Sequence, residues 1–213
     1  MVSIRRNKVS VDTLVIGNGE SRSTINLTPF LSNHILVGCN AIHRDIQVNH
    51  LICCDRRMIE ESIASKNTSK TKTYVRNEYI DFYSRNDERI KVLPQLPYQG
   101  KNKIDMPIHW GSGPYSLLVS AGLQSNRIKL IGFDLYSKNN FVNNIYKDSK
   151  HYNKKDSKPI DHSFWEYQIA KVFEYFPNKE FIIYNSEDWK MPNLWKRSNV
   201  SFEVLATKNL TFA

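Results

Sequence analysis

Three short apolar runs in the N-terminal part of the chain constrain its fold more than any other feature. They span residues 11–16, 34–39 and 50–54, and within each run hydrophobic residues follow one another instead of alternating with polar ones. Runs of this kind are typical of strands that are covered on both faces, as in a parallel sheet. The intervals between them leave room for short helices, as βαβ units require. The pattern therefore predicts an α/β protein.

Later segments continue this alternation of strands and helices. Further strands are expected at 73–76, 90–93, 127–133, 180–184 and, as an edge strand, 202–205. Helices are expected at 56–65, 115–123 and 162–176. We expect Ser112 and Asp161 to cap the second and third of these helices, because Ser and Asp side chains accept hydrogen bonds from the first helical amides.

The whole chain, residues 1–213, is interpreted as a single Rossmann-like domain, with a mostly parallel sheet and helices on both of its faces. Its core is expected over about residues 11–185, followed by a C-terminal tail over 189–213. Residues 94–107 contain three prolines and are expected to form a loop. Residues 137–160 are rich in Lys, Asn, Ser and Asp, which predicts a mobile, polar, lid-like loop.

The charge of the chain favours an anionic ligand. It has 30 Lys and Arg against 21 Asp and Glu, a formal net charge of +9. Such a surplus suits a phosphorylated or carboxylated small molecule, an acidic membrane surface or a nucleic acid. The basic residues are spread along the sequence, so nucleic acid is not expected to be the main ligand. Peripheral membrane association and a homo-oligomer both stay open.

The remaining composition predicts a cytoplasmic protein. Its three cysteines, Cys39, Cys53 and Cys54, form no CxxC pair, which argues against disulfides and against a thiolate zinc site. Residues 1–8 lack the apolar stretch of a signal peptide, and no run approaches the roughly 18 apolar residues of a membrane span. The sequence has no Asp-x-Asp pair, HExxH motif or P-loop, so a reaction without a metal ion is favoured.

Small and polar residues gather where four predicted strands end. In open α/β sheets, ligands bind beyond the carboxyl ends of the strands, and glycines let backbone amides approach a phosphate. Glu20, however, is acidic beside a proposed phosphate, and a tight strand-to-helix turn without a ligand is the alternative interpretation. The strand-end residues predicted to bind a nucleotide are Gly17, Asn18, Gly19, Ser21, Asn40, Asp55, Gly132, Phe133 and Asp134.

Two predicted helix starts are further candidates for the site. Gly111, Ser112 and Gly113 open one helix, where the amide dipoles favour an anion or a polar base edge. His162 opens another helix, and a helix N-terminus disfavours the charged imidazolium, so a neutral general base is expected there. The alternatives are a simple capped helix and a histidine with a structural or solvated role.

The order of these motifs resembles a known family. The chain has GNGES at residues 17–21, Gly38-Cys39-Asn40, the GSGPYSLLVSAGL segment, IKLIGFDLY, and then His162-Ser163. This is similar to the bacterial sialyltransferases of glycosyltransferase family 42, with their GNGPS, CN, TSG, GIDFY and HS motifs. It also resembles the related motility-accessory-factor and 6-hydroxymethylpterin pyrophosphokinase-like proteins. The resemblance spans roughly residues 12–185.

The resemblance implies a Rossmann-like fold and a CMP-sugar donor that reacts with a glycan acceptor, with no cofactor besides the donor. Asn18 and Ser21 would contact the donor phosphate, and Asn40 would contact its ribose or phosphate. Phosphate departure and acceptor activation would fall to tyrosines and a histidine. The implied roles are a nucleotide pocket of Ser112, Gly113, Phe133 and Asp134, hydrogen bonds to the leaving phosphate from Tyr136 and from Tyr146 or Tyr152, and His162 as the general base.

The chain departs from the family pattern in three places. Glu20 replaces a proline and Gly111 replaces the threonine of TSG. His109 stands where those enzymes tend to have an arginine, and it is counted with the candidate catalytic residues. The leading hypothesis is a metal-independent glycosyltransferase that uses a CMP-linked sugar. One alternative is a pyrophosphokinase-like phosphoryl transferase, which would need Mg²⁺ although few carboxylates besides Asp55 and Asp134 are available. The other is a nucleotide-binding or nucleic-acid-binding protein without catalysis.

Overall fold

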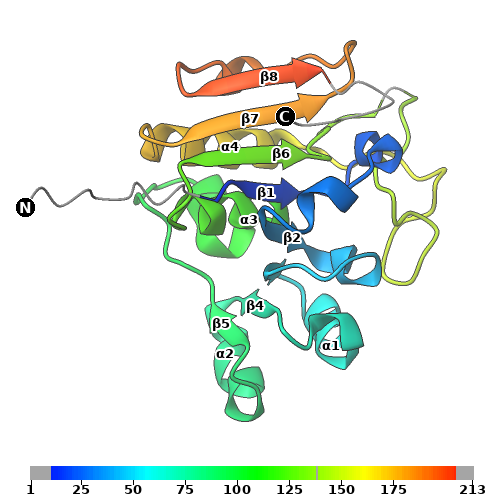
Figure 1. The fold of residues 1–213 in the computed structure, drawn as a ribbon, viewed down its shortest axis with the longest axis vertical. Coiled ribbons are helices and arrows are strands. Elements are labelled where there is room, and N and C mark those ends of the chain that lie inside the picture. The colour runs from blue at the N-terminus through cyan, green and yellow to red at the C-terminus, as the bar shows by residue number, and fades with distance from the viewer. Residues whose placement is uncertain (1–10, 138, 205–213) are drawn as a thin grey trace, which may run out of the picture.

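The structure, a computed structural model, describes residues 11–137 and 139–204. Its strands form one eight-stranded sheet in the order β5-β4-β3-β2-β1-β6-β7-β8, and every pair of neighbours is parallel (Figure 1). The strands are β1 (Thr13–Ile16), β2 (Ile35–Cys39), β3 (His50–Cys53), β4 (Lys72–Val75), β5 (Ile90–Val92), β6 (Arg127–Ile131), β7 (Glu180–Asn185) and β8 (Val200–Val204). The expected parallel α/β sheet is therefore confirmed, and Leu205 of the predicted edge strand lies outside the described residues.

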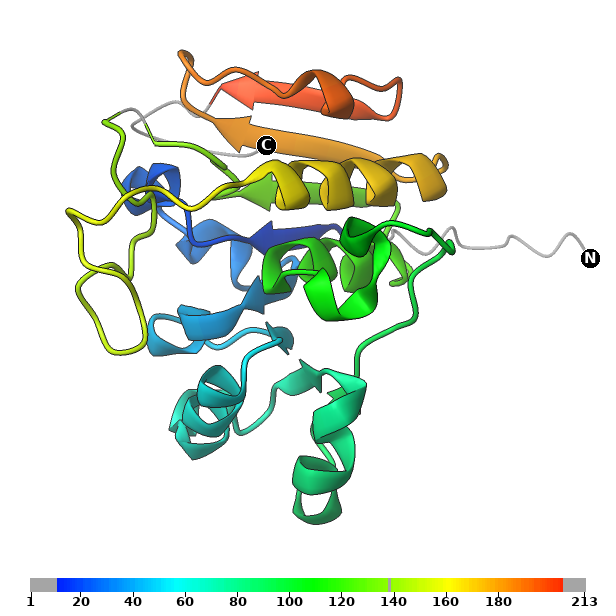
Figure 2. The ribbon, with the colours of Figure 1, turned by 180° about the vertical axis from the view of Figure 1, so that it is seen from behind.

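Helices cover both faces of this sheet. On one face lie α3 (Ser112–Ala121) and α4 (Ser163–Tyr175), which stand in front of the strands in Figure 2. The other face is packed by α1 (Arg56–Ala64) and by short 3₁₀ turns such as Asn40–Arg44.

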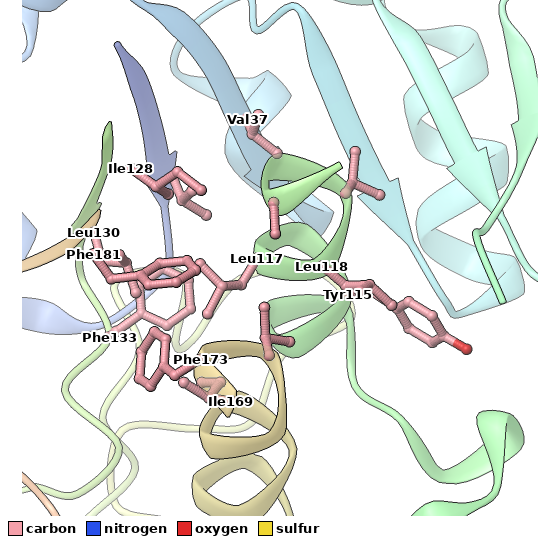
Figure 3. Close-up of a cluster of buried hydrophobic side chains, with 14 of the residues drawn as sticks. Val37, Tyr115, Leu117, Leu118, Ile128, Leu130, Phe133, Ile169, Phe173 and Phe181 are labelled. Atoms are coloured by element: carbon pink, nitrogen blue, oxygen red, sulfur yellow. The ribbon is translucent and has the colours of Figure 1, made fainter. Parts of the chain in front are cut away.

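Alternation along each strand divides the buried side chains between two cores. Val15 of β1 joins the core under α3 and α4, whereas Leu14 and Ile16 join the core under α1. In the first core, Leu117 of α3 and Phe173 of α4 lie beside residues of β6 and β7 (Figure 3). Because both faces are buried, the strands read as continuous apolar runs in the sequence.

The structure corrects three local predictions. It contains a helix, α2 (Asn77–Tyr83), that the sequence does not predict, because it is only seven residues long and its apolar side, Tyr79, Ile80 and Tyr83, is only partly buried against the core. Ser112 does not cap α3: Gly111 occupies that position, and Ser112 Oγ accepts a hydrogen bond from the Cys54 amide at 3.1 Å. The cap position of α4 belongs to His162, although the Asp161 carboxylate accepts from the Ser163 amide at 2.9 Å.

The predicted lid-like loop forms neither helix nor strand in its described residues, 137 and 139–160. It passes the carboxyl ends of the central strands (Figure 2) and is anchored there by hydrogen bonds. The Ile145 amide donates to the Asn18 carbonyl at 2.9 Å, and the guanidinium of Arg44 donates to Ser149 Oγ at 2.8 Å. The loop thus forms part of the body of the protein in this structure.

The described part of the C-terminal tail folds back onto the core. Trp189 and Trp195 are buried, and their indole N–H groups donate to the carbonyls of Asp134 and Glu166. Among the described residues, no helix is both long enough and apolar enough to cross a membrane.

Candidate functional site

A cavity of about 320 Å³ lies at the carboxyl ends of the central strands. The chain runs from β1 to β2 on one side, and β6 pairs with β1 on the other, so the strand order reverses at β1. This is the switch point at which open α/β sheets bind ligands. The sequence-predicted residues that line the cavity are Gly17, Asn18, Gly19, Asn40, Asp55, His109, Ser112, Gly113, Gly132, Phe133 and Asp134.

The Gly17–Gly19 turn is shaped by its contact with the Gly132 segment. The Gly17 amide donates to the Ile131 carbonyl at 2.8 Å, and the Gly19 amide donates to the Gly132 carbonyl at 2.9 Å. A Cβ on Gly17 would lie 2.3 Å from the Gly132 oxygen, and one on Gly19 would lie 2.5 Å from Cγ of Asp134. These glycines therefore let two strand ends touch, and their amides are already used within the protein.

Asp134 occupies the anion position of this turn. Its carboxylate accepts hydrogen bonds from both the amide and the hydroxyl of Ser21, the former at 2.8 Å, and from Asn185 Nδ2 at 3.2 Å. Ser21 does not line the cavity. Ser21, which the sequence predicted to contact a phosphate, thus directs its hydroxyl and its amide at a buried carboxylate instead.

Glu20 anchors the loop that borders the cavity. Its carboxylate forms an ion pair with Lys147, and its amide donates to Asn143 Oδ1 at 2.8 Å. Asn143 also lines the cavity. The acidic residue that seemed out of place beside a phosphate therefore binds a lysine of segment 137–160.

Asn18 and Asn40 line the cavity, and each contains an unsatisfied buried acceptor. In both residues the side-chain Oδ1 is buried and has no hydrogen-bond partner within the described residues. Asn40 also has a left-handed backbone with φ 51°, a conformation that Asn tolerates better than most residues. Buried polar atoms normally find partners, so these two oxygens suit hydroxyl or amino donors of a ligand.

The N-terminus of α3 forms a second polar edge of the cavity. The first amides of a helix have no partner within the helix, and here they belong to Ser112 and Gly113, because Pro114 has no N–H. Together with the helix dipole, these amides favour an anionic group. This helix start replaces the glycine turn as the better candidate for a phosphate.

Arg76 is a cavity residue that was not among the sequence-predicted candidates. It directly follows β4, so the strand-end rule that selected Asn40 and Asp55 would also have found it. His109, by contrast, was expected, and it lines the same wall.

His162 and Tyr136 lie together beside the cavity. Their ring centroids are 6.1 Å apart, and the cavity is lined by the neighbouring residues Ile160 and Trp165. The Tyr136 hydroxyl donates to the Lys190 carbonyl at 3.0 Å and accepts from the Lys190 amide at 2.7 Å. Neither His162 nor Tyr136 lines the cavity in this structure.

Tyr146 and Tyr152 are not brought to the cavity. Both pack with the core on the α1 face, and the Tyr146 hydroxyl joins the Arg22 guanidinium, at 2.6 Å, to the Asp45 carboxylate. Burial raises the pKa of both tyrosines. In this structure they hold segment 137–160 to the body of the protein.

The buried cysteines are poor nucleophiles. Cys39 and Cys54 line the cavity, but burial raises the pKa of Cys39 to about 12 and that of Cys54 to about 11. The reactive form of cysteine is the thiolate, which is scarce at such values. Over residues 11–137 and 139–204, no group of three or more His, Cys, Asp or Glu side chains is arranged to hold a metal ion.

Fold and cavity together define a class: α/β proteins with a parallel Rossmann-like sheet and a ligand-sized cavity at the switch point of its strand order. The chain matches no protein-family model, and no curated protein matches its sequence.

Among solved structures, the fold is similar to that of the monofunctional α-2,3-sialyltransferase Cst-I from Campylobacter jejuni. The TM-score is 0.62 over 97% of this chain and 84% of that chain, at 13% identity. A mutant of the α-2,3/8-sialyltransferase CstII matches more loosely, with a TM-score of 0.47 and 11% identity over 81% of this chain and 80% of that one. The expected sialyltransferase-like fold is thus found.

Proposed function

We propose that this protein is a glycosyltransferase that binds a nucleotide-activated sugar, CMP-linked as in the sialyltransferases, in the cavity at the carboxyl ends of β1, β2, β3 and β6. The observation that supports the proposal is the set of polar groups that line this cavity, which lies at the switch point of a sialyltransferase-like fold. It combines oxygens of Asn18 and Asn40 that are unsatisfied within the described residues with the helix-start amides of Ser112 and Gly113, which have no partner inside α3.

The donor would be held at two edges of the cavity. Its phosphate binds at the start of α3, where the amides and the helix dipole favour negative charge. Its hydroxyl or amino groups donate to Asn18 and Asn40, whose side-chain oxygens have no hydrogen-bond partner in the part of the chain that the structure describes. Asp55 lies exposed at the end of β3 and offers a carboxylate to further hydroxyl groups.

Chemistry would proceed by attack of an acceptor hydroxyl on the anomeric carbon. A nitrogen of His162 takes the hydroxyl proton as the new C–O bond forms, and the bond between the anomeric carbon and the phosphate oxygen breaks. The nucleoside monophosphate leaves with the bonding electrons. Tyr136 packs against His162, so we assign it the placement of the imidazole in addition to its proposed assistance to the phosphate.

The test is hydrolysis and transfer of CMP-linked sialic acid by the purified protein. His162→Ala should lower the rate of transfer by about 10²- to 10⁴-fold, the range for loss of a general base. His34→Ala is the matched control, because His34 lies just before β2, at the end of the strands opposite to the cavity. Transfer by His162→Ala at the wild-type rate would show that the base is assigned to the wrong residue.

The same assay, run with EDTA, distinguishes sugar transfer from the alternative phosphoryl-transfer reaction. A pyrophosphokinase-like reaction would need Mg²⁺, so EDTA would abolish it. Asp134, one of its two candidate ligands, is already bonded to Ser21 and Asn185. We therefore expect sugar transfer to persist in EDTA, and loss of activity there would favour the phosphoryl transferase.

A further inference from the structure

Arg76 joins the end of β3 to the wall of the cavity that contains His109. Its Nε donates to the Cys54 carbonyl at 3.1 Å, and its Nη2 donates to the Trp110 carbonyl at 3.0 Å. Its Nη1 donates to the carbonyls of Pro107 and Ile108. Four neutral oxygens, one from Cys54 and three from residues 107–110, thus fix the guanidinium in place.

The charge of Arg76 has no carboxylate partner within 4.0 Å in the described part of the chain. Four described arginines are buried or half-buried. Of these, Arg22, Arg44 and Arg89 each form an ion pair with an aspartate or a glutamate, and Arg76 does not. A partly buried charge is normally paired, so this position calls for an anion from outside the protein.

The start of α3, near Arg76, adds to the unpaired positive charge at this part of the cavity. Trp110, whose carbonyl Arg76 binds, lies two residues before the start of α3. Cations are favoured at the C-terminus of a helix and disfavoured at its N-terminus, because the first amides already carry partial positive charge. A full charge and a helix start of the same sign therefore lie at one corner of the cavity.

We propose that Arg76 determines the selectivity of the cavity for an anionic ligand, by attracting the phosphate of the bound nucleotide. This inference rests on the proposed function and assigns the fixed positive charge of the wall to Arg76 rather than to His109. The same charge attracts other phosphates that enter the cavity, including inorganic pyrophosphate.

The test compares charged and neutral ligands by isothermal titration calorimetry. CMP, cytidine and inorganic pyrophosphate are titrated into the wild type, Arg76→Gln, Arg76→Lys and the matched control Arg56→Gln. Arg56 is an exposed arginine on α1, so its variant removes the same charge away from the cavity. We expect Arg76→Gln to weaken CMP binding at least tenfold and cytidine binding less than twofold. Arg76→Lys should keep CMP affinity within about threefold, and Arg56→Gln should match the wild type.

A purely structural role would have a different signature. If Arg76 only holds the wall, Arg76→Gln weakens CMP and cytidine equally, and that result overturns the inference. If Arg76→Gln does not fold, the salt dependence of ligand binding to the wild type tests the inference instead. The affinity for CMP should fall as NaCl rises from 50 to 500 mM, while the affinity for cytidine stays constant. Salt-independent CMP binding would likewise overturn it.

The probes also separate this inference from the proposed function. Arg76-dependent binding of pyrophosphate without binding of CMP or cytidine supports the charge selectivity and contradicts a cytidine-nucleotide donor. Equal affinity of the wild type for CMP and cytidine keeps the nucleotide pocket and refutes the selectivity. A wild type that binds none of the three ligands refutes both.

Discussion

At the scale of single residues, Asp134 organises the first turn of the protein. Its carboxylate takes both donors of Ser21, and its carbonyl accepts from the indole of Trp189 at 2.9 Å. The glycines of the turn permit this arrangement because they bring no Cβ between the two strand ends. A motif that reads as a phosphate-binding turn therefore has an internal carboxylate as its anion.

This account predicts a steric effect at Gly19. Gly19→Ala places a Cβ 2.5 Å from Asp134 Cγ, and the carboxylate must move away from Ser21 to accommodate it. Because the backbone of Gly19 has φ −64°, the effect is packing rather than backbone strain. We expect a loss of about 1–3 kcal/mol in the free energy of unfolding, measured by urea denaturation.

Gly113→Ala is the matched control for this prediction. A Cβ there meets only Phe133, at 3.9 Å, and alanine in a helix is favoured over glycine by roughly 0.5–1 kcal/mol. The control should leave stability unchanged or raise it. Equal stability of the two variants would contradict the assignment of Gly19 to close packing.

At the scale of elements, ion pairs and contacts with aromatic rings attach the described residues of segment 137–160 to the body of the protein. Arg44 lies over the rings of Tyr146 and Tyr152 and forms a bidentate pair with Glu61 of α1. The Arg44 guanidinium holds the pKa of Glu61 below its usual range. Tyr146 and Tyr152, which were predicted to contact the leaving phosphate, thus hold in place the segment that borders the cavity and do not line the cavity themselves.

The pairing of β3 with β4 predicts a dependence of stability on pH. His50 on β3 is buried, and desolvation followed by the nearby charge of Lys72 lowers its pKa to about 4. The unfolded chain binds this proton near pH 6.5, so stability falls as pH drops from 6.5 toward 4. Between pH 7 and pH 5 we expect His50 to account for about 2 kcal/mol of this loss.

His50→Gln should flatten that part of the curve. The measurement is urea denaturation of the wild type and the variant at pH 7, 6 and 5. An unchanged slope in His50→Gln would show that this histidine does not bind its proton preferentially in the unfolded chain.

At the scale of the whole molecule, the sheet places the candidate cavity at the carboxyl ends of its strands. The parallel strands all end on the same side, and α3 starts there as well (Figure 1). A ligand in this cavity touches the ends of β1, β2, β3 and β6 together. Binding should therefore stabilise the fold as a whole rather than one segment.

The corresponding prediction is a rise in melting temperature with CMP. At a concentration 100-fold above its Kd, a ligand that binds only the folded state adds about 2.7 kcal/mol. Scanning fluorimetry with CMP, UMP, GMP and ATP measures it, and we expect the largest shift with CMP. No shift with any nucleotide, together with salt-sensitive binding to short DNA, would favour the nucleic-acid-binding alternative.

The sequence by itself determined the strands, their parallel arrangement and most of the cavity edge. Continuous apolar runs report burial on both faces, and the residues that follow them, such as Asn40 and Asp55, must lie at the carboxyl edge. The local sequence carries this information because successive side chains of a strand point to opposite faces of the sheet, and here both faces are buried.

Only the tertiary structure decided what each polar group faces. It directed Ser21 at Asp134, paired Glu20 with Lys147 and bonded the Tyr146 hydroxyl to Arg22. It also placed Arg76 at the cavity, with no carboxylate partner among residues 11–137 and 139–204. These contacts join residues far apart in the chain. Hydrogen-bond geometry depends on how the segments pack, which no local pattern of side chains records.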